Sequence, residues 1–157
     1  MIEDDIKKLK EISLTIKRIN GKIKLLSLLN KAKKAYDESN YSECLDNCKK
    51  ILEDNPNNPI ALRGIGCVMQ SLGKIEDALD YYNKAVEFSE NKEIEYTLIG
   101  TIYYNEENLD KAIEYFNMAI DINDNYDPAY EGKNQSMLEN HLKILDLQDN
   151  LIKQNLF

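Results

Sequence analysis

The chain has 157 residues, of which 43% are hydrophobic and 31% are charged, a composition typical of a globular domain and not of a disordered or membrane-spanning chain. Its net charge of −8 disfavours binding to duplex nucleic acid. No apolar run has the length of a signal peptide or a membrane span, and the three cysteines follow no disulfide framework. We therefore expect a cytoplasmic protein that does not interact with a membrane.

The charge is unevenly distributed along the chain. Residues 1–34 hold ten basic and four acidic side chains, a net charge of +6, whereas the remainder carries −14. Two differently solvated surfaces would explain this distribution. Attraction of the basic segment to an acidic partner, or to the acidic end of another copy, is the alternative.

Apolar residues recur every three or four positions along residues 2–19 and again along residues 22–38. This spacing predicts two amphipathic helices, with Asn20-Gly21 as a stop signal between them. A third helix is predicted over residues 41–54, before the turn-forming run at residues 55–59.

Four shorter helices follow at regular intervals, and the turns between them are two to four residues long, which predicts antiparallel hairpins. These helices are predicted at residues 59–71, 75–88, 93–105 and 109–121. Asp127-Pro128 then restarts a helix, with Asp as N-cap and Pro at the first helical position. This last helix extends to about Gln154, and a break near Asn140 is one alternative.

Two stretches, residues 62–88 and 96–122, agree position by position at an offset of 34 residues. The matched pairs are Ile65 and Ile99, Gly66 and Gly100, Ala78 and Ala112, Tyr82 and Phe116, and Ala85 and Ala119. Small residues at these positions let two helices approach closely, and the large ones fill the space beside them. A repeat of this length predicts a stack of helical hairpins.

These residues resemble the tetratricopeptide repeat family, whose unit is a 34-residue helix–turn–helix. Three tandem units are predicted at residues 25–58, 59–92 and 93–126. The third matches the family pattern best, and the first is degenerate, with Cys44 and Cys48 at the small and aromatic positions. The resemblance implies an all-α, right-handed superhelical solenoid of antiparallel helix hairpins. An N-terminal amphipathic helix (1–21) and one or more C-terminal capping helices (127–157) are expected to flank it.

The resemblance also implies a function: a scaffold or adaptor that binds another protein, as a peptide or an amphipathic helix, in a concave groove lined by the first helix of each unit. Carried over onto this chain, the groove positions are Leu26, Leu29, Asn30, Lys33, Ile60, Arg63, Gly64, Cys67, Ile94, Thr97, Leu98 and Thr101.

Some members of the family hold the acidic C-terminal tails of chaperones with Lys, Asn and Arg side chains. The matching positions here are Leu29, Lys33, Gly64, Ile94 and Leu98, of which only Lys33 is basic. An apolar peptide or amphipathic helix therefore suits the groove better than an acidic tail. A chaperone-associated role is the weaker alternative.

Residues that could carry chemistry are few, and we expect no enzyme, cofactor or metal. The single histidine, His141, has no partner that would suggest a catalytic arrangement. Cys44 and Cys48 lie one helical turn apart and could form half of a metal site. They also occupy core positions of the first unit, and this interpretation is favoured. Cys67 stands alone.

The predicted helices at both ends leave one question open. The segment from Tyr126 to Phe157 carries a wider apolar stripe than one capping helix requires. It could cap the stack, fill the groove or pair with another copy. Self-association through the terminal helices is accordingly the alternative function.

Overall fold

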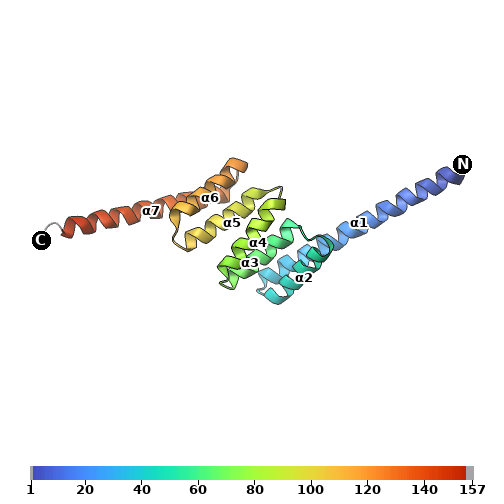
Figure 1. Cartoon of the computed structure of the whole chain (residues 1–157), viewed down its shortest axis with the longest axis horizontal. Coiled ribbons are helices and arrows are strands. Elements are labelled where there is room, and N and C mark those ends of the chain that lie inside the picture. Colours follow the sequence, from blue (N-terminus) through green and yellow to red (C-terminus); the bar gives the residue numbers. More distant parts are fainter. Residues whose placement is uncertain (1, 155–157) are drawn as a thin grey trace.

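Seven α-helices make up residues 2–154, the part of the chain that the computed structural model describes, and no strand occurs within it (Figure 1). The predicted all-α fold is confirmed. The helices are α1 (Ile2–Asp37), α2 (Tyr41–Asp54), α3 (Pro59–Ser71), α4 (Ile75–Phe88), α5 (Lys92–Asn105), α6 (Leu109–Ile122) and α7 (Asp127–Gln154). Residue 1 and residues 155–157, which belong to the predicted terminal segments, lie outside the described part.

Consecutive helices pack against one another as hairpins, α1 with α2, α3 with α4, and α5 with α6, and each hairpin stacks on the next. The first half of α7 packs on α6 and α5. Long parts of α1 and α7 project from this stack in opposite directions (Figure 1). No helix within residues 2–154 is both long and apolar enough to cross a bilayer.

The turns inside the three hairpins share one backbone conformation at 34-residue intervals. Ser39, Gly73 and Glu107 all have positive φ, at 58°, 73° and 58°. After each of them the next amide donates to the carbonyl five residues earlier, at 2.7–2.9 Å, which satisfies the end of the preceding helix. The degenerate first unit thus closes in the same way as the two clear ones.

The matched small and large residues meet as the repeat predicts. A Cβ atom added to Gly66 would lie 2.6 Å from the Tyr82 ring, and one added to Gly100 would lie 2.9 Å from the Phe116 ring. Both rings are almost completely buried. Glycine is required at these positions because the aromatic ring of the second helix rests directly on the backbone of the first.

The predicted interruption at Asn20-Gly21 is wrong, since α1 runs unbroken from Ile2 to Asp37. A glycine that ends a helix adopts positive φ, and Gly21 does not. Glycine inside a helix costs about 1 kcal/mol relative to alanine. Ending one helix and nucleating another costs more than that, so the helix continues.

The last helix is also unbroken, so the alternative break near Asn140 is not observed. The start of α7 occupies the place that the first helix of a fourth unit would have. Ala129 is fully buried there, as Ala61 is at the equivalent position two units earlier. Gly132 lies against the ring of Phe116 in the same way that Gly64 lies against Cys48. No second helix follows within the described residues.

Candidate functional site

A hollow of about 210 Å³ lies between α1 and α3 on the inner side of the first two units. Its lining residues are Leu29, Ala32, Lys33, Tyr36, Cys44, Cys48, Ile60, Arg63, Gly64 and Cys67. Six of the predicted groove residues therefore meet in one place: Leu29, Lys33, Ile60, Arg63, Gly64 and Cys67. The hollow is also lined by Ala32, Tyr36 and the two α2 cysteines, which lie outside the predicted set because that set comprises one face of each first helix.

The walls of this hollow are mainly apolar. Ile60 is 46% exposed at its rim, and Leu29 is half-buried in its wall. At one edge the Tyr36 hydroxyl shares a 3.0 Å hydrogen bond with the Ser71 hydroxyl, which ties α1 to the end of α3. The hollow therefore offers an apolar surface with a fixed shape.

The two cations of the hollow are both paired within the chain. Lys33 Nζ lies 2.7 Å from the Asp37 carboxylate, one turn along α1, and this pair is solvent-exposed. Arg63 Nη1 donates to Glu95 Oε1 at 2.9 Å. Glu95 is completely buried, and its other oxygen, Oε2, has no hydrogen-bond partner. The Arg63 charge is thus committed to a buried carboxylate and is largely neutralised.

Glu95 is a site residue that the sequence analysis missed, although the repeat contains the signal. The equivalent residues one unit earlier and one unit later are Ala61 and Ala129, and both are fully buried. A glutamate at a buried alanine position must find a cation. Arg63, on the neighbouring first helix, is that cation.

The three cysteines surround the inner end of the hollow as neutral thiols. Burial raises the pKa of Cys44 and of Cys67, and it raises the pKa of Cys48 to about 12. Cys44 and Cys48 are only 2% exposed and belong to the core of the first unit, as the packing interpretation predicts. Within residues 2–154 no three His, Cys, Asp or Glu side chains are grouped as a metal site would require.

The predicted groove positions on α5 do not reach this hollow. Leu98 packs against the core around Tyr82, in the place where the smaller Gly64 faces Cys48 one unit earlier. The Thr101 hydroxyl donates to the Thr97 carbonyl at 2.9 Å, and Ile94 is half-buried. On α1, Leu26 and Asn30 are exposed and lie outside the lining.

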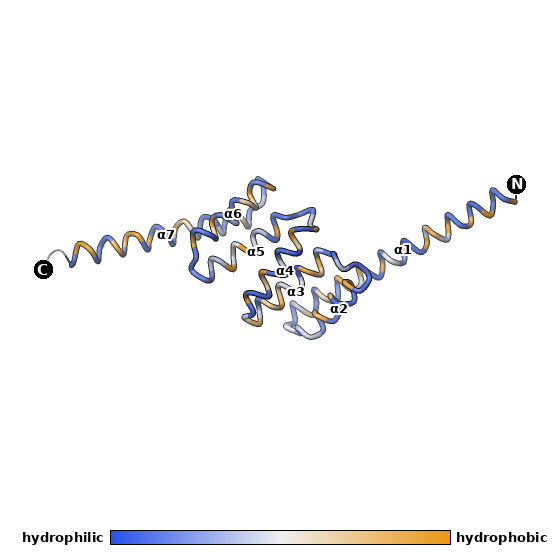
Figure 2. The backbone as a smooth tube through the Cα atoms, viewed as in Figure 1, coloured by the Kyte–Doolittle hydropathy of each residue, from blue (hydrophilic) through white to orange (hydrophobic). Residues whose placement is uncertain are grey.

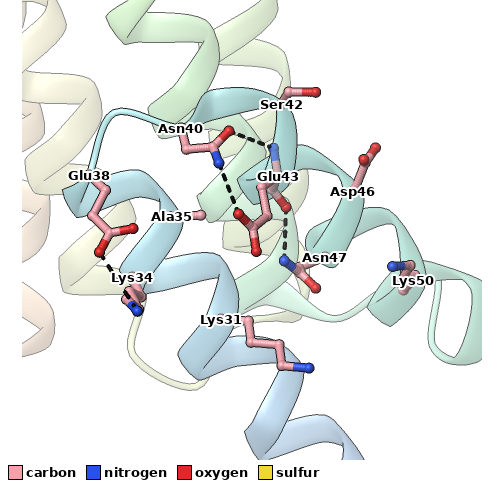
Figure 3. Close-up of a pocket in the computed structure, with 10 residues that line it drawn as sticks. All are labelled: Lys31, Lys34, Ala35, Glu38, Asn40, Ser42, Glu43, Asp46, Asn47 and Lys50. Atoms are coloured by element: carbon pink, nitrogen blue, oxygen red, sulfur yellow. Dashed lines mark hydrogen bonds and ion pairs between the residues drawn. The ribbon is translucent and has the colours of Figure 1, made fainter.

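A second and larger hollow, of about 580 Å³, lies on the outer face of the α1–α2 hairpin (Figure 3). Its polar side chains are hydrogen-bonded locally: the Asn40 amide donates to the Glu43 carboxylate at 2.9 Å, and the Asn47 amide donates to the Glu43 main-chain carbonyl at 2.9 Å. Lys34 pairs with Glu38 at 3.8 Å. This face is the N-terminal end of the stack, and it is polar enough to meet water without a capping helix.

His141 is exposed on α7. Nearby, Lys143 bridges from α7 to the α5–α6 turn, 3.1 Å from Glu107, and also pairs with Glu139 at 3.4 Å. The Lys143–Glu107 pair links the middle of α7 to the third unit.

Comparison with protein families matches residues 64–92 and 94–126 to the tetratricopeptide repeat. No curated protein sequence matches the chain. Among solved structures, the first tetratricopeptide domain of Spaghetti (RPAP3), bound to the HSP90 peptide SRMEEVD, is 21% identical with a TM-score of 0.66; the match covers 74% of this chain and 94% of that one. The Sgt2 tetratricopeptide domain from Aspergillus fumigatus is 18% identical with a TM-score of 0.66, covering 74% and 79%.

A third match, to the O-GlcNAc transferase of Thermobaculum terrenum, is 18% identical with a TM-score of 0.65. It covers 73% of this chain but only 22% of the transferase, so the likeness concerns a small part of that enzyme. All three likenesses are in the fold. The family matches show that the chain contains tetratricopeptide repeats, and the likenesses in fold and the 34-residue spacing of the turns agree with this.

Proposed function

We propose that this protein is a non-catalytic binding module that holds an apolar peptide, or one face of an amphipathic helix, in the hollow between α1 and α3. The observation that carries the proposal is the apolar wall formed by Leu29 and Ile60 on two neighbouring first helices. An inserted side chain would lose contact with water on several sides at once, which is how amphipathic segments are recognised in grooves.

The electrostatics argue against an acidic tail as the ligand. Binding a carboxylate requires a cation that is free to donate to it. The charge of Arg63 is balanced by the buried Glu95 carboxylate, and Lys33 is one exposed lysine beside Asp37, so the hollow has no excess of positive charge. A ligand carboxylate would also approach the buried charge of Glu95. Selectivity for apolar over acidic segments is the expected result.

Peptides selected from a displayed random library against the wild-type chain provide the test. A selected peptide, labelled with a fluorophore, is titrated by anisotropy against the wild type and against Ile60→Glu. Burying one isoleucine contributes roughly 1.5–3 kcal/mol. We therefore expect Ile60→Glu to weaken binding by about ten- to a hundredfold.

Leu72→Glu is the matched control, because Leu72 is 50% exposed on the same hairpin but does not line the hollow. It should leave the affinity unchanged. The peptide SRMEEVD should give no saturable binding. Equal affinity of the selected peptide for Ile60→Glu and wild type would place the binding surface elsewhere, and tight binding of SRMEEVD would refute the electrostatic argument.

A further inference from the structure

The N-terminal part of α1 extends well beyond the repeats. The first residue from the N-terminus that is bonded to another helix is Lys24, whose Nζ lies 2.6 Å from the Asp54 carboxylate. The preceding segment, residues 2–23, is about 33 Å long. It carries eight apolar side chains that are 47–74% exposed, alternating with hydrophilic ones along the projecting helix (Figure 2). Helices in proteins gain most of their stability from packing an apolar face, and this segment has no such packing within its own chain.

Six of these eight apolar residues, continued by Leu26, follow a heptad, and Ile6 and Leu14 do not. An isoleucine or leucine recurs at alternating spacings of three and four residues, at Leu9, Ile12, Ile16, Ile19, Ile23 and Leu26. In heptad notation Leu9 is at an a position and Ile12 at a d position; Ile2 is at the a position one heptad earlier, where Asp5 occupies the d position. We call these residues (Ile2, Leu9, Ile12, Ile16, Ile19, Ile23 and Leu26) the α1 seam.

The period of this seam, unbroken from Leu9 to Leu26, indicates the kind of partner. A strict seven-residue repeat drifts by about 20° per heptad around a straight helix, and it stays in line only when helices supercoil around one another. A helix lying flat on a lipid surface has no reason to keep that period. The seam therefore fits other helices better than a membrane.

The partner helix must come from outside the molecule. The projecting part of α7 lies at the opposite end of the stack and points away (Figure 1), so it cannot cover the seam of its own chain. A second copy of α1 offers the same seam. Burying one large apolar side chain removes roughly 60–120 Å² of apolar surface from water. Seven such residues from each of two copies would therefore bury on the order of 1,000 Å². That area reaches the size of a specific interface.

The residues that flank the seam permit this pairing. In parallel register, the residue at each g position lies beside the e position five residues later in the other copy. Lys8 then meets Ser13, and Lys22 meets Ser27, so no lysine at these positions faces another lysine across the interface. Asn20 meets Thr15 in the same way.

We propose that the chain self-associates through the α1 seam, as a parallel coiled coil of α1 helices. Isoleucine at both a and d positions favours three or four strands over two. The repeats of every copy then lie at the same end of the coil. A consequence that rests on the proposed function is that several hollows are displayed together and can bind a multivalent partner with increased avidity.

The test is the mass of the full chain in solution, measured by light scattering at micromolar concentration. We expect the wild type to have a multiple of 18.2 kDa, and the double variant Ile16→Lys/Ile19→Lys to be a monomer. Neither residue contacts the repeats, so far-UV circular dichroism should show that the repeats of this variant remain folded. Leu14→Lys is the matched control: Leu14 is 59% exposed but lies on the face opposite the seam, and its variant should keep the wild-type mass.

A monomeric wild type would overturn the proposal, as would an oligomer that survives Ile16→Lys/Ile19→Lys. A wild type that stays monomeric but binds anionic lipid vesicles would show instead that the segment is a membrane-surface helix. For the orientation, copies labelled at the N-terminus with donor or acceptor dyes are mixed; efficient energy transfer supports parallel strands, and its absence in the oligomer overturns that arrangement. These readouts do not involve the hollow, so their failure and the failure of peptide binding are distinguishable.

Discussion

Replacing Arg63 by methionine should destabilise the protein strongly, although Arg63 is partly exposed. The substitution keeps most of the side-chain volume but removes the guanidinium that is bonded to the fully buried Glu95 carboxylate. Breaking one partner of a buried ion pair costs about 3–5 kcal/mol, because the other charge is left uncompensated. Since small domains have a total stability of about 5–15 kcal/mol, this is a large fraction of the whole.

Removing both charges together should not lower the free energy of unfolding. The double variant Arg63→Met/Glu95→Ala removes both charges, and it gives position 95 the alanine that is fully buried at the equivalent positions 61 and 129. Replacing a buried ion pair by apolar residues is often neutral or stabilising by about 1–4 kcal/mol. We expect the double variant to be at least as stable as the wild type.

Urea unfolding followed by far-UV circular dichroism, combined as a double-mutant cycle, measures both effects. Neighbouring repeats can unfold separately, so identical denaturant dependence in all variants is required before free energies are compared. If Arg63→Met cost less than about 1 kcal/mol, Glu95 could not be a buried carboxylate that depends on Arg63. A double variant less stable than the single one would refute the reasoning in the same way.

Other substitutions test the repeat itself, each by the same unfolding assay. Gly66→Ala should cost about 1–3 kcal/mol, because the new Cβ would lie 2.6 Å from the Tyr82 ring, whereas Gly21→Ala, with open space around it, should increase helix stability by up to about 1 kcal/mol. Lys74→Asn should stabilise by about 1 kcal/mol, since Lys74 makes no side-chain cap at the start of α4. The free energy of unfolding should fall as pH rises from 9 to about 12, because the Cys48 thiol ionises in the unfolded chain at a lower pH than in the folded one. Over this range the unfolded chain binds fewer protons than the folded protein.

Each of these expectations has an outcome that contradicts it. Equal effects of Gly66→Ala and Gly21→Ala would mean that the Tyr82 ring does not rest on the α3 backbone. An unchanged or lower stability of Lys74→Asn would show that the N-cap geometry of Asn40 and Asn108 does not extend to the middle unit. A Cys48→Ala variant with the wild-type alkaline profile would exclude the buried thiol as the cause of the pH dependence.

The sequence by itself determined the fold, because the contacts that define the repeat join residues that are close in the sequence and lie on adjacent helices. Gly66 and Tyr82, or Gly100 and Phe116, lie 16 residues apart on two adjacent helices, so their sizes could be matched from the sequence alone. The turn positions 39, 73 and 107 repeat with the same period, even though only one of the three residues is glycine. The chain also indicated six of the ten residues that line the hollow.

Only the tertiary structure decided which of the predicted groove residues meet and which charges are free. Leu98 packs against the core that contains Tyr82, whereas Gly64, at the equivalent position one unit earlier, has no side chain and leaves room for the hollow. Arg63 and Glu95 come from different units, and their pairing depends on how closely α3 and α5 stack. The continuity of α1 through Asn20-Gly21 was likewise settled by a balance of energies: a local stop signal costs about 1 kcal/mol inside a helix, less than interrupting it. That continuous helix presents the α1 seam as one uninterrupted surface.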